Sequence, residues 1–148
     1  NLTARAEFCL GDWGHFIAER FDLVVCNPPR VATKDIRYLL PEMRDHDPRL
    51  SLDGGTDGVA CFRAVAAQFA KLAKPDGFGA FQAGTKYHDA TIRVFQKAGF
   101  YDIATLRNIV PSPCGILVAN RKTAMNFLVR FADRLMRKDI DVAPASKI

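Results

Sequence analysis

The stretch "FDLVVCNPPR", residues 21–30, decides the fold because it holds a whole strand and the point where that strand ends. Residues 21–27 are almost continuously apolar, which is typical of a parallel strand buried on both faces. The strand must stop at Asn27, because the next two residues are prolines, which have a fixed φ angle and no N–H group for a sheet ladder. A polar amide therefore stands at the carboxyl end of a strand, followed by two rigid residues and Arg30.

The rest of the chain alternates between strand and helix patterns. Apolar helical spacing predicts helices over residues 58–74, 88–100 and 124–138, with a short one around residues 36–40. Further strands are expected at residues 6–12, 78–84, 101–109 and 115–121. This alternation predicts an α/β fold with a mostly parallel sheet. The "VPSPCG" turn between the last two strands makes that late pair antiparallel.

The length of 148 residues suits one domain or part of one. We expect residues 1–138 to form a partial domain and residues 139–148 to be a frayed tail. The sequence begins without methionine and goes almost directly into a predicted strand, which suggests a start in mid-domain. The polar connection over residues 30–57 is long for a compact domain, and such loops are usually functional or mobile.

Composition narrows the class without naming a function. The formal charge of +5 is mildly basic and spread along the chain, which permits an acidic partner or RNA but does not require one. The cysteines have no metal-ligand spacing, so we expect no metal site and read Cys9 and Cys26 as buried free thiols. No signal peptide or bilayer-length apolar stretch is seen, and the sequence is interpreted as that of a soluble, cytoplasmic protein.

Polar side chains follow two of the predicted strands, Asp12 after the first and Asn27 after the second. In open α/β sheets ligands bind beyond the carboxyl ends of the strands. Each residue also fits a structural role, Asp12 as a helix cap and Asn27 in an Asx turn. Their matching positions, together with the double proline, favour a functional role.

An Asn-Pro-Pro turn is suited to holding a planar NH₂ group. The Asn27 side-chain oxygen can accept one hydrogen, and the Pro28 carbonyl, aimed by the rigid φ angles of Pro28 and Pro29, can accept the other. The nitrogen lone pair is then directed at an electrophilic carbon by positioning, with little proton chemistry. An aromatic residue usually belongs next, to stack on the flat acceptor, and here that position holds Arg30.

"NPPR" after "FDLVV" resembles the Asn-Pro-Pro-aromatic motif of S-adenosylmethionine-dependent amino-methyltransferases, which act on adenine, cytosine or glutamine amides. The stretch "EMRDHDPRLSLDGGTDGVACFRAV", residues 42–65, resembles the segment after that motif in the release-factor glutamine methyltransferase family. "KLAKPDGFGAFQAG" and "VFQKAGFYDI" follow the same family's pattern, so the resemblance covers roughly residues 6–121.

The resemblance implies a Rossmann-like class I methyltransferase sheet that lacks its N-terminal strands, with S-adenosylmethionine as the methyl donor. It implies transfer to the side-chain nitrogen of a glutamine in a Gly-Gly-Gln loop of a translation release factor, the protein partner. The matching positions are Asn27, Pro28 and Pro29 for the acceptor amide, and Asp12, Trp13 and Asn27 for the donor. Independently of the motif, Arg30 and Arg49 are expected to contact the protein substrate. Arg44 and Arg49 are also open to a second interpretation, pairing with Asp45 and Asp47.

The sequence departs from the family's pattern in three ways. The glycine-rich loop and acidic residue that bind the donor's methionine and ribose are absent from the chain. Arg30 replaces the aromatic residue and brings a positive charge near a sulfonium donor, which we expect to lower methyl transfer. Gln82 stands where the family usually has a glutamate, and "VPSPCG" replaces its glycine-arginine turn.

Two other functions stay open. The first is amino-methylation of adenine or cytosine in a nucleic acid, using the same turn. The second is a catalytically inactive, methyltransferase-derived subunit that binds an assembly. The basic side of the predicted last helix fits an RNA-rich assembly or a solvated helix face; its residues are Arg130, Arg134, Arg137 and Lys138. The sequence does not set the oligomeric state.

Overall fold

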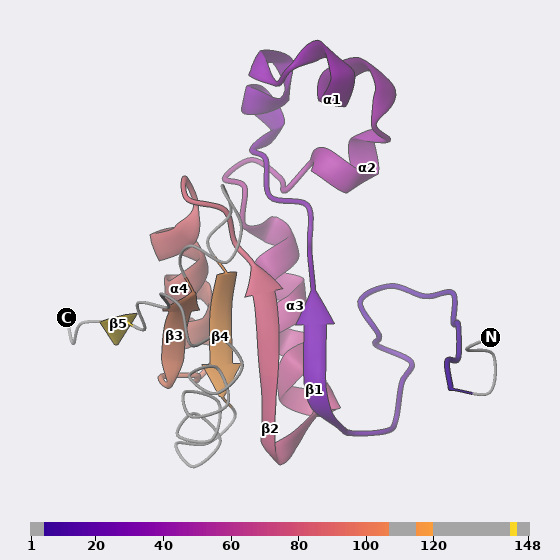
Figure 1. The fold of residues 1–148 in the computed structure, drawn as a ribbon, viewed down its shortest axis with the longest axis vertical. Helices are drawn as coiled ribbons and strands as arrows, with labels where there is room; N and C mark the ends of the chain where they lie inside the picture. Colours follow the sequence, from indigo (N-terminus) through magenta and orange to yellow (C-terminus); the bar gives the residue numbers. More distant parts are fainter. Residues whose placement is uncertain (1–4, 107–114, 120–142, 145–148) are drawn as a thin grey trace.

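A computed structural model describes residues 5–106, 115–119 and 143–144 of the chain (Figure 1). The strands are β1 (Phe21–Cys26), β2 (Ala73–Gln82), β3 (Ile103–Leu106), β4 (Gly115–Ala119) and β5 (Ala143–Pro144). The helices are the 3₁₀ helix η1 (Thr33–Tyr38) and the α-helices α1 (Pro41–His46), α2 (Arg49–Leu52), α3 (Ala60–Leu72) and α4 (His88–Lys97). None of these helices is long and apolar enough to cross a membrane.

The described strands form one sheet in the order β1-β2-β4-β3-β5. β1 and β2 are parallel, whereas β4 lies between β2 and β3 and is antiparallel to both. β3 consequently runs in the same direction as β1 and β2, and the short β5 pairs antiparallel with β3. The α/β class and the antiparallel β3–β4 pair are confirmed, although β1–β2 is the one parallel pair among these strands.

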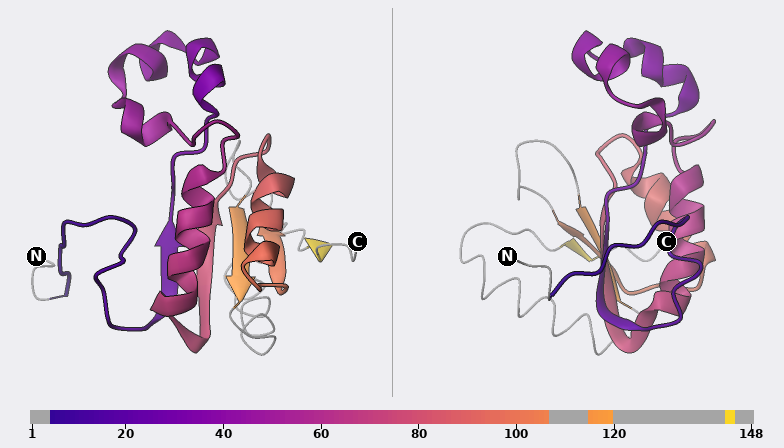
Figure 2. Two further views of the ribbon diagram at one scale, coloured as in Figure 1. Left: turned by 180° about the vertical axis from the view of Figure 1, so that it is seen from behind. Right: turned by 90° about the vertical axis from the view of Figure 1, so that its right-hand side faces the viewer.

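Helices α3 and α4 pack on the same face of the sheet (Figure 2). The buried side chains of α3 recur at helical spacing, as the sequence predicts; they are Phe62, Val65, Ala66, Phe69 and Leu72.

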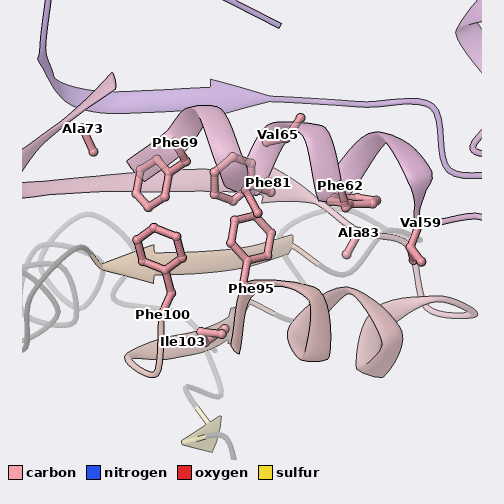
Figure 3. Packing of buried hydrophobic residues seen from close by; sticks show 11 residues of the cluster. Val59, Phe62, Val65, Phe69, Ala73, Phe81, Ala83, Phe95, Phe100 and Ile103 are labelled. Carbon is pink, nitrogen blue, oxygen red and sulfur yellow. The ribbon is translucent and has the colours of Figure 1, made fainter. Parts of the chain in front are cut away.

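Four phenylalanines form the centre of this core (Figure 3). Phe69 comes from α3, Phe81 from β2 and Phe95 from α4, and Phe100 follows Gly99, whose φ of +92° ends that helix. Their ring centroids lie 4.7–6.2 Å apart in tilted and edge-to-face contacts, which add to the stabilisation from burial alone. This core fixes the ends of β1 and β2 relative to α4.

The prediction that β1 is buried on both faces is wrong for this structure. Val24 and Cys26 pack against the core, but Phe21, Leu23 and Val25 are 40%, 47% and 70% exposed. Among the described strands β1 is the outermost, and α3 and α4 both lie on the face of the sheet opposite the side chains of Phe21, Leu23 and Val25. A continuous apolar run shows that a strand can be buried on both faces, but it does not show whether another element packs on each face.

The predicted strand at residues 6–12 is also wrong, because this segment has no strand pairing among the described residues. Phe8 and Leu10 are 93% and 102% exposed, and Cys9, predicted to be buried, is exposed as well. A strand is stable only when a neighbour satisfies its backbone groups, and an apolar pattern alone does not provide that neighbour. Cys26 is half-buried.

The long connection after β1 carries η1, α1 and α2 beyond the carboxyl ends of β1 and β2, at the top of Figure 1. η1 agrees with the short helix predicted near residues 36–40, and Pro41 stands at the first turn of α1, where its missing N–H is harmless. The predicted helix over residues 124–138 and residues 110–114 of the "VPSPCG" turn lie outside the described residues. Of residues 139–148, only the two of β5 are described.

Candidate functional site

The Asn-Pro-Pro turn lies where two parallel strands end side by side. Cys26, the last residue of β1, pairs with Phe81 near the end of β2. Asn27 is exposed, whereas Pro28 is fully buried and Pro29 is half-buried. The rigid part of the turn is therefore anchored in the protein, and the carboxamide is left accessible to a ligand.

The loop that contains "DGG", residues 53–55, is hydrogen-bonded to the chain that directly follows this turn. Val31 forms an isolated parallel bridge with Asp53. The Gly54 N–H donates to the Val31 carbonyl at 2.7 Å, and the Val31 N–H donates to the Leu52 carbonyl at 3.0 Å. Gly54 thus has a structural use that the sequence did not reveal: a Cβ atom there would lie 2.8 Å from Arg30 Cα, so only glycine lets the two loops lie directly against one another.

The carboxylate of Asp53 adds two more hydrogen bonds to this loop. Asp53 accepts hydrogen bonds from the Thr33 hydroxyl at 2.7 Å and from the Gly55 N–H at 3.0 Å. These bonds, the Thr33 bond first, lower the pKa of Asp53, with Arg49 adding a smaller effect. The loop is therefore held in place by a carboxylate that stays charged at neutral pH.

The start of α4 holds the next part of the chain. The Tyr87 hydroxyl accepts a hydrogen bond from the Ala32 N–H at 3.2 Å and donates one to Asp35 at 2.8 Å. Lys86 pairs with the same carboxylate at 2.6 Å. Hydrogen bonds from Lys86 and then Tyr87 lower the pKa of Asp35. The chain after the turn is thereby held against the start of α4, since Asp35 and Tyr87 are 52 residues apart in the sequence.

Arg30 turns back onto the carboxamide that begins the turn. Its Nη1 donates a hydrogen bond to Asn27 Oδ1 at 2.9 Å. A Cβ atom added to Gly84 would lie 3.1 Å from Arg30 Nε, so the guanidinium stem passes close to the turn after β2. The structure thus brings together Asn27, Pro28, Pro29 and Arg30 at one edge of the sheet.

Asp12 and Trp13 lie in the loop before β1, at a distance from this cluster along the chain. The Asp12 carbonyl accepts from the N–H and the ring Nδ1 of His15, and the half-buried Trp13 packs against the core with a φ of +50°. Within the described part of the chain no hydrogen bond or ion pair joins either residue to the Asn-Pro-Pro turn. Asp12 is nevertheless near α3, because it helps burial and Asp53 to raise the pKa of Cys61.

The arginines of the long connection are paired with carboxylates. Arg44 contacts Asp45 at 2.7 Å, as one of the two interpretations predicted. Arg49 contacts Asp53 at 3.4 Å, a different partner from the predicted Asp45 or Asp47, and its side chain is 66% exposed.

The residues that sequence reasoning missed are those that hold the turn rather than form it. Asp35, Tyr87 and Gly84 carry no motif of their own, and their roles depend on contacts between distant segments. Gly54 lies in the "DGG" stretch, but nothing in the sequence of that stretch shows that it packs against Arg30.

An exposed amide on a rigid turn lies at the carboxyl ends of two parallel strands in an α/β sheet, the edge at which proteins of this class bind their ligands. Named relatives identify the family within this class. The chain is 39% identical over 110 residues to the release factor glutamine methyltransferase of Caulobacter vibrioides. The aligned residues make up 74% of this chain and 38% of that protein. Over the matching part, the chain belongs to the release factor glutamine methyltransferase family.

Other relatives carry the same name. The enzymes of Rhodospirillum rubrum and Bradyrhizobium diazoefficiens are each 45% identical over 84 residues, or 57% of this chain and 26% and 28% of theirs. The chain thus spans less than two fifths of the length of each of these three relatives. No family model matches the chain.

Proposed function

We propose that this protein transfers a methyl group from S-adenosylmethionine to the side-chain amide nitrogen of a glutamine in a translation release factor. The observation that carries the proposal is the exposed Asn27 amide on its anchored turn, in a chain whose relatives are named for this reaction. Residues 1–138 would form part of a Rossmann-like class I catalytic domain, acting in the cytoplasm on its protein partner.

The turn supplies what an amide acceptor needs. Asn27 Oδ1 accepts one hydrogen of the glutamine NH₂ and the Pro28 carbonyl accepts the other. Because Pro28 is fully buried and Pro29 has a fixed φ, the two acceptors keep their spacing while the substrate binds. Holding both hydrogens fixes the plane of the amide, so that its nitrogen lone pair faces the methyl carbon.

The residues present fit one end of the methyl donor. The exposed Asp12 carboxylate can accept a hydrogen bond from an adenine amino group, and the Trp13 ring beside it can contact the base. S-adenosylmethionine, when bound, supplies an electrophilic methyl carbon attached to a positively charged sulfur. Asn27 would hold the acceptor amide, and Arg30 and Arg49 would contact the protein substrate.

The test is a methyl-transfer assay with the full-length protein that contains this chain. Labelled S-adenosylmethionine is incubated with a release factor, with the same factor carrying alanine in place of the glutamine of its Gly-Gly-Gln loop, and with RNA and DNA. Label on the unchanged factor alone supports the proposal. Label on RNA or DNA instead would favour the nucleic-acid alternative, and no label on any of them would favour a catalytically inactive subunit.

A further inference from the structure

The chain that leaves the Asn-Pro-Pro turn is held from two sides. The N–H groups of Val31 and Thr33 donate to backbone carbonyls of residues 52–55, at 3.0 and 2.9 Å. Ala32 between them is extended, with φ of −60° and ψ of 138°, and successive N–H groups of an extended segment point to opposite sides. The Ala32 N–H donates to the Tyr87 hydroxyl at 3.2 Å. A side chain from the residue before α4 therefore holds the side that the loop does not.

The Tyr87 hydroxyl is itself oriented by a carboxylate. It donates to Asp35 Oδ2 at 2.8 Å, and Lys86 Nζ lies 2.6 Å from the same oxygen. Because the hydroxyl proton is directed at Asp35, a lone pair of the hydroxyl oxygen is left for the Ala32 N–H. The hydrogen bonds from Lys86 and Tyr87 lower the pKa of Asp35, so this acceptor is charged at neutral pH.

The aromatic ring that carries the hydroxyl is fixed by packing. A Cβ atom built on Gly58, whose φ is +75°, would lie 2.8 Å from Tyr87 Cε1 and 2.9 Å from its Cζ. The ring therefore lies directly against the backbone of Gly58, and it also packs against the hydrophobic core. The Tyr87 carbonyl accepts from the N–H and the hydroxyl of the fully buried Thr91, both at 2.9 Å. The fold thus sets the position of the hydroxyl oxygen.

The path from Ala32 back to Asn27 is short and stiff. Ala32 is 2% exposed, so its N–H would be left buried and unpaired without the Tyr87 hydroxyl, which favours a shift of the chain towards another partner. Pro28 and Pro29 have fixed φ angles and absorb little of such a shift. The shift therefore reaches the Pro28 carbonyl and the Asn27 amide, the two acceptors of the proposed reaction.

We propose that Tyr87 is a positioning residue for methyl transfer: its hydroxyl fixes the Ala32 backbone and, through it, the spacing of the Asn27 and Pro28 acceptors. This inference rests on the proposed function, because it assigns a further role within the same site. Tyr87 acts through the turn and not by contact with the substrate. Loss of the hydroxyl therefore lowers kcat more than it raises KM, because the amide still binds but its nitrogen is poorly directed.

The experiment is a double-mutant cycle in the full-length protein. Tyr87→Phe keeps the ring against Gly58 and removes the hydroxyl. Label transfer from S-adenosylmethionine to a release factor is measured for this variant, for Asn27→Ala and for the double variant. We expect Tyr87→Phe alone to lower kcat about tenfold and to change KM for the release factor less than about twofold. In the Asn27→Ala background the same change should lower kcat less than about threefold, because one of the two acceptors it positions is already lost.

Tyr101→Phe is the matched control. It removes a hydroxyl from a side chain that is 75% exposed, and it should leave kcat and KM unchanged. A purely structural role of Tyr87 would lower kcat equally with and without Asn27. Equal falls in the two backgrounds, or no fall in Tyr87→Phe, would overturn the proposal.

Hydrogen exchange of the Ala32 amide separates this proposal from the proposed function, since it requires no methyl transfer. Followed by NMR, the exchange should be at least about tenfold faster in Tyr87→Phe than in Tyr101→Phe. Faster exchange in a protein that labels no release factor would support the hold of Tyr87 on the chain and contradict the proposed reaction. Equal exchange in the two variants would contradict the role of Tyr87 itself.

Discussion

The residue that matters most is Asn27, and its setting was predictable only in part. Two prolines after an apolar run indicate a rigid stop, and a polar amide at that stop indicates a ligand site. The bond from Arg30 to Asn27 Oδ1 was not predictable, because a turn sequence does not say where a long flexible side chain will go. It depends on Gly54 and Gly84, which come from loops that the fold brings together.

The reactivity of Cys26, the residue directly before Asn27, tests how deeply the end of β1 is buried. Burial, and to a smaller extent Cys61, raises the pKa of Cys26 from 9.0 to about 11. The folded protein therefore holds this proton more tightly than the unfolded chain, and the stability linked to it is complete below pH 9 and is lost as the pH rises towards 11. Cys9, in contrast to the half-buried Cys26, is exposed to solvent.

We accordingly expect iodoacetamide at pH 9 to alkylate Cys26 at least about tenfold more slowly than Cys9. Peptide mapping by mass spectrometry gives the two rates, and the unfolded protein in urea is the control, in which both should react alike. Equal rates in the folded protein would show that Cys26 is not in the surroundings described.

At the scale of elements, helices were predicted better than strands. The apolar spacing of residues 58–74 and 88–100 gave α3 and α4 to within a few residues, because a helix forms its backbone hydrogen bonds within one segment. The strand pattern at residues 6–12 misled, since strand formation requires a second segment. The prediction that both faces of β1 are buried is wrong for the same reason, because the sequence of β1 does not show which elements pack on it.

The aromatic core between α3 and α4 is expected to hold these elements together. Phe95 is fully buried and contacts Phe81 and Phe100, so Phe95→Ala should lower the free energy of unfolding by about 3–5 kcal/mol. Phe8→Ala is the matched control at a 93% exposed position and should change it by less than about 0.5 kcal/mol. Urea denaturation followed by circular dichroism measures both, and similar losses in the two variants would contradict the described packing.

At the scale of the whole molecule, the proposed function assigns to the described residues an acceptor turn and one end of a donor site. Asp12 and Trp13 are the residues assigned to adenine, and the described contacts do not join them to Asn27. The aligned part makes up 38% of the Caulobacter relative, so the sequence could predict the family but not the complete site.

We expect the chain of 148 residues on its own to bind S-adenosylmethionine weakly or not at all, because it lacks a glycine-rich loop for the methionine and ribose. Calorimetry with the purified chain measures this directly, and its thermal unfolding curve confirms that the sample is folded. Micromolar affinity would show that the residues present complete the donor site.

The central claim is that Asn27 holds the glutamine amide. It is tested most directly by the rate of label transfer from S-adenosylmethionine to a release factor, measured for the full-length protein with and without Asn27→Ala. We expect a fall in kcat/KM of at least about a hundredfold, because one of the two groups that orient the acceptor is lost. Arg93→Gln, on the exposed side of α4, should leave the rate unchanged. A rate that stays the same in Asn27→Ala would contradict the account.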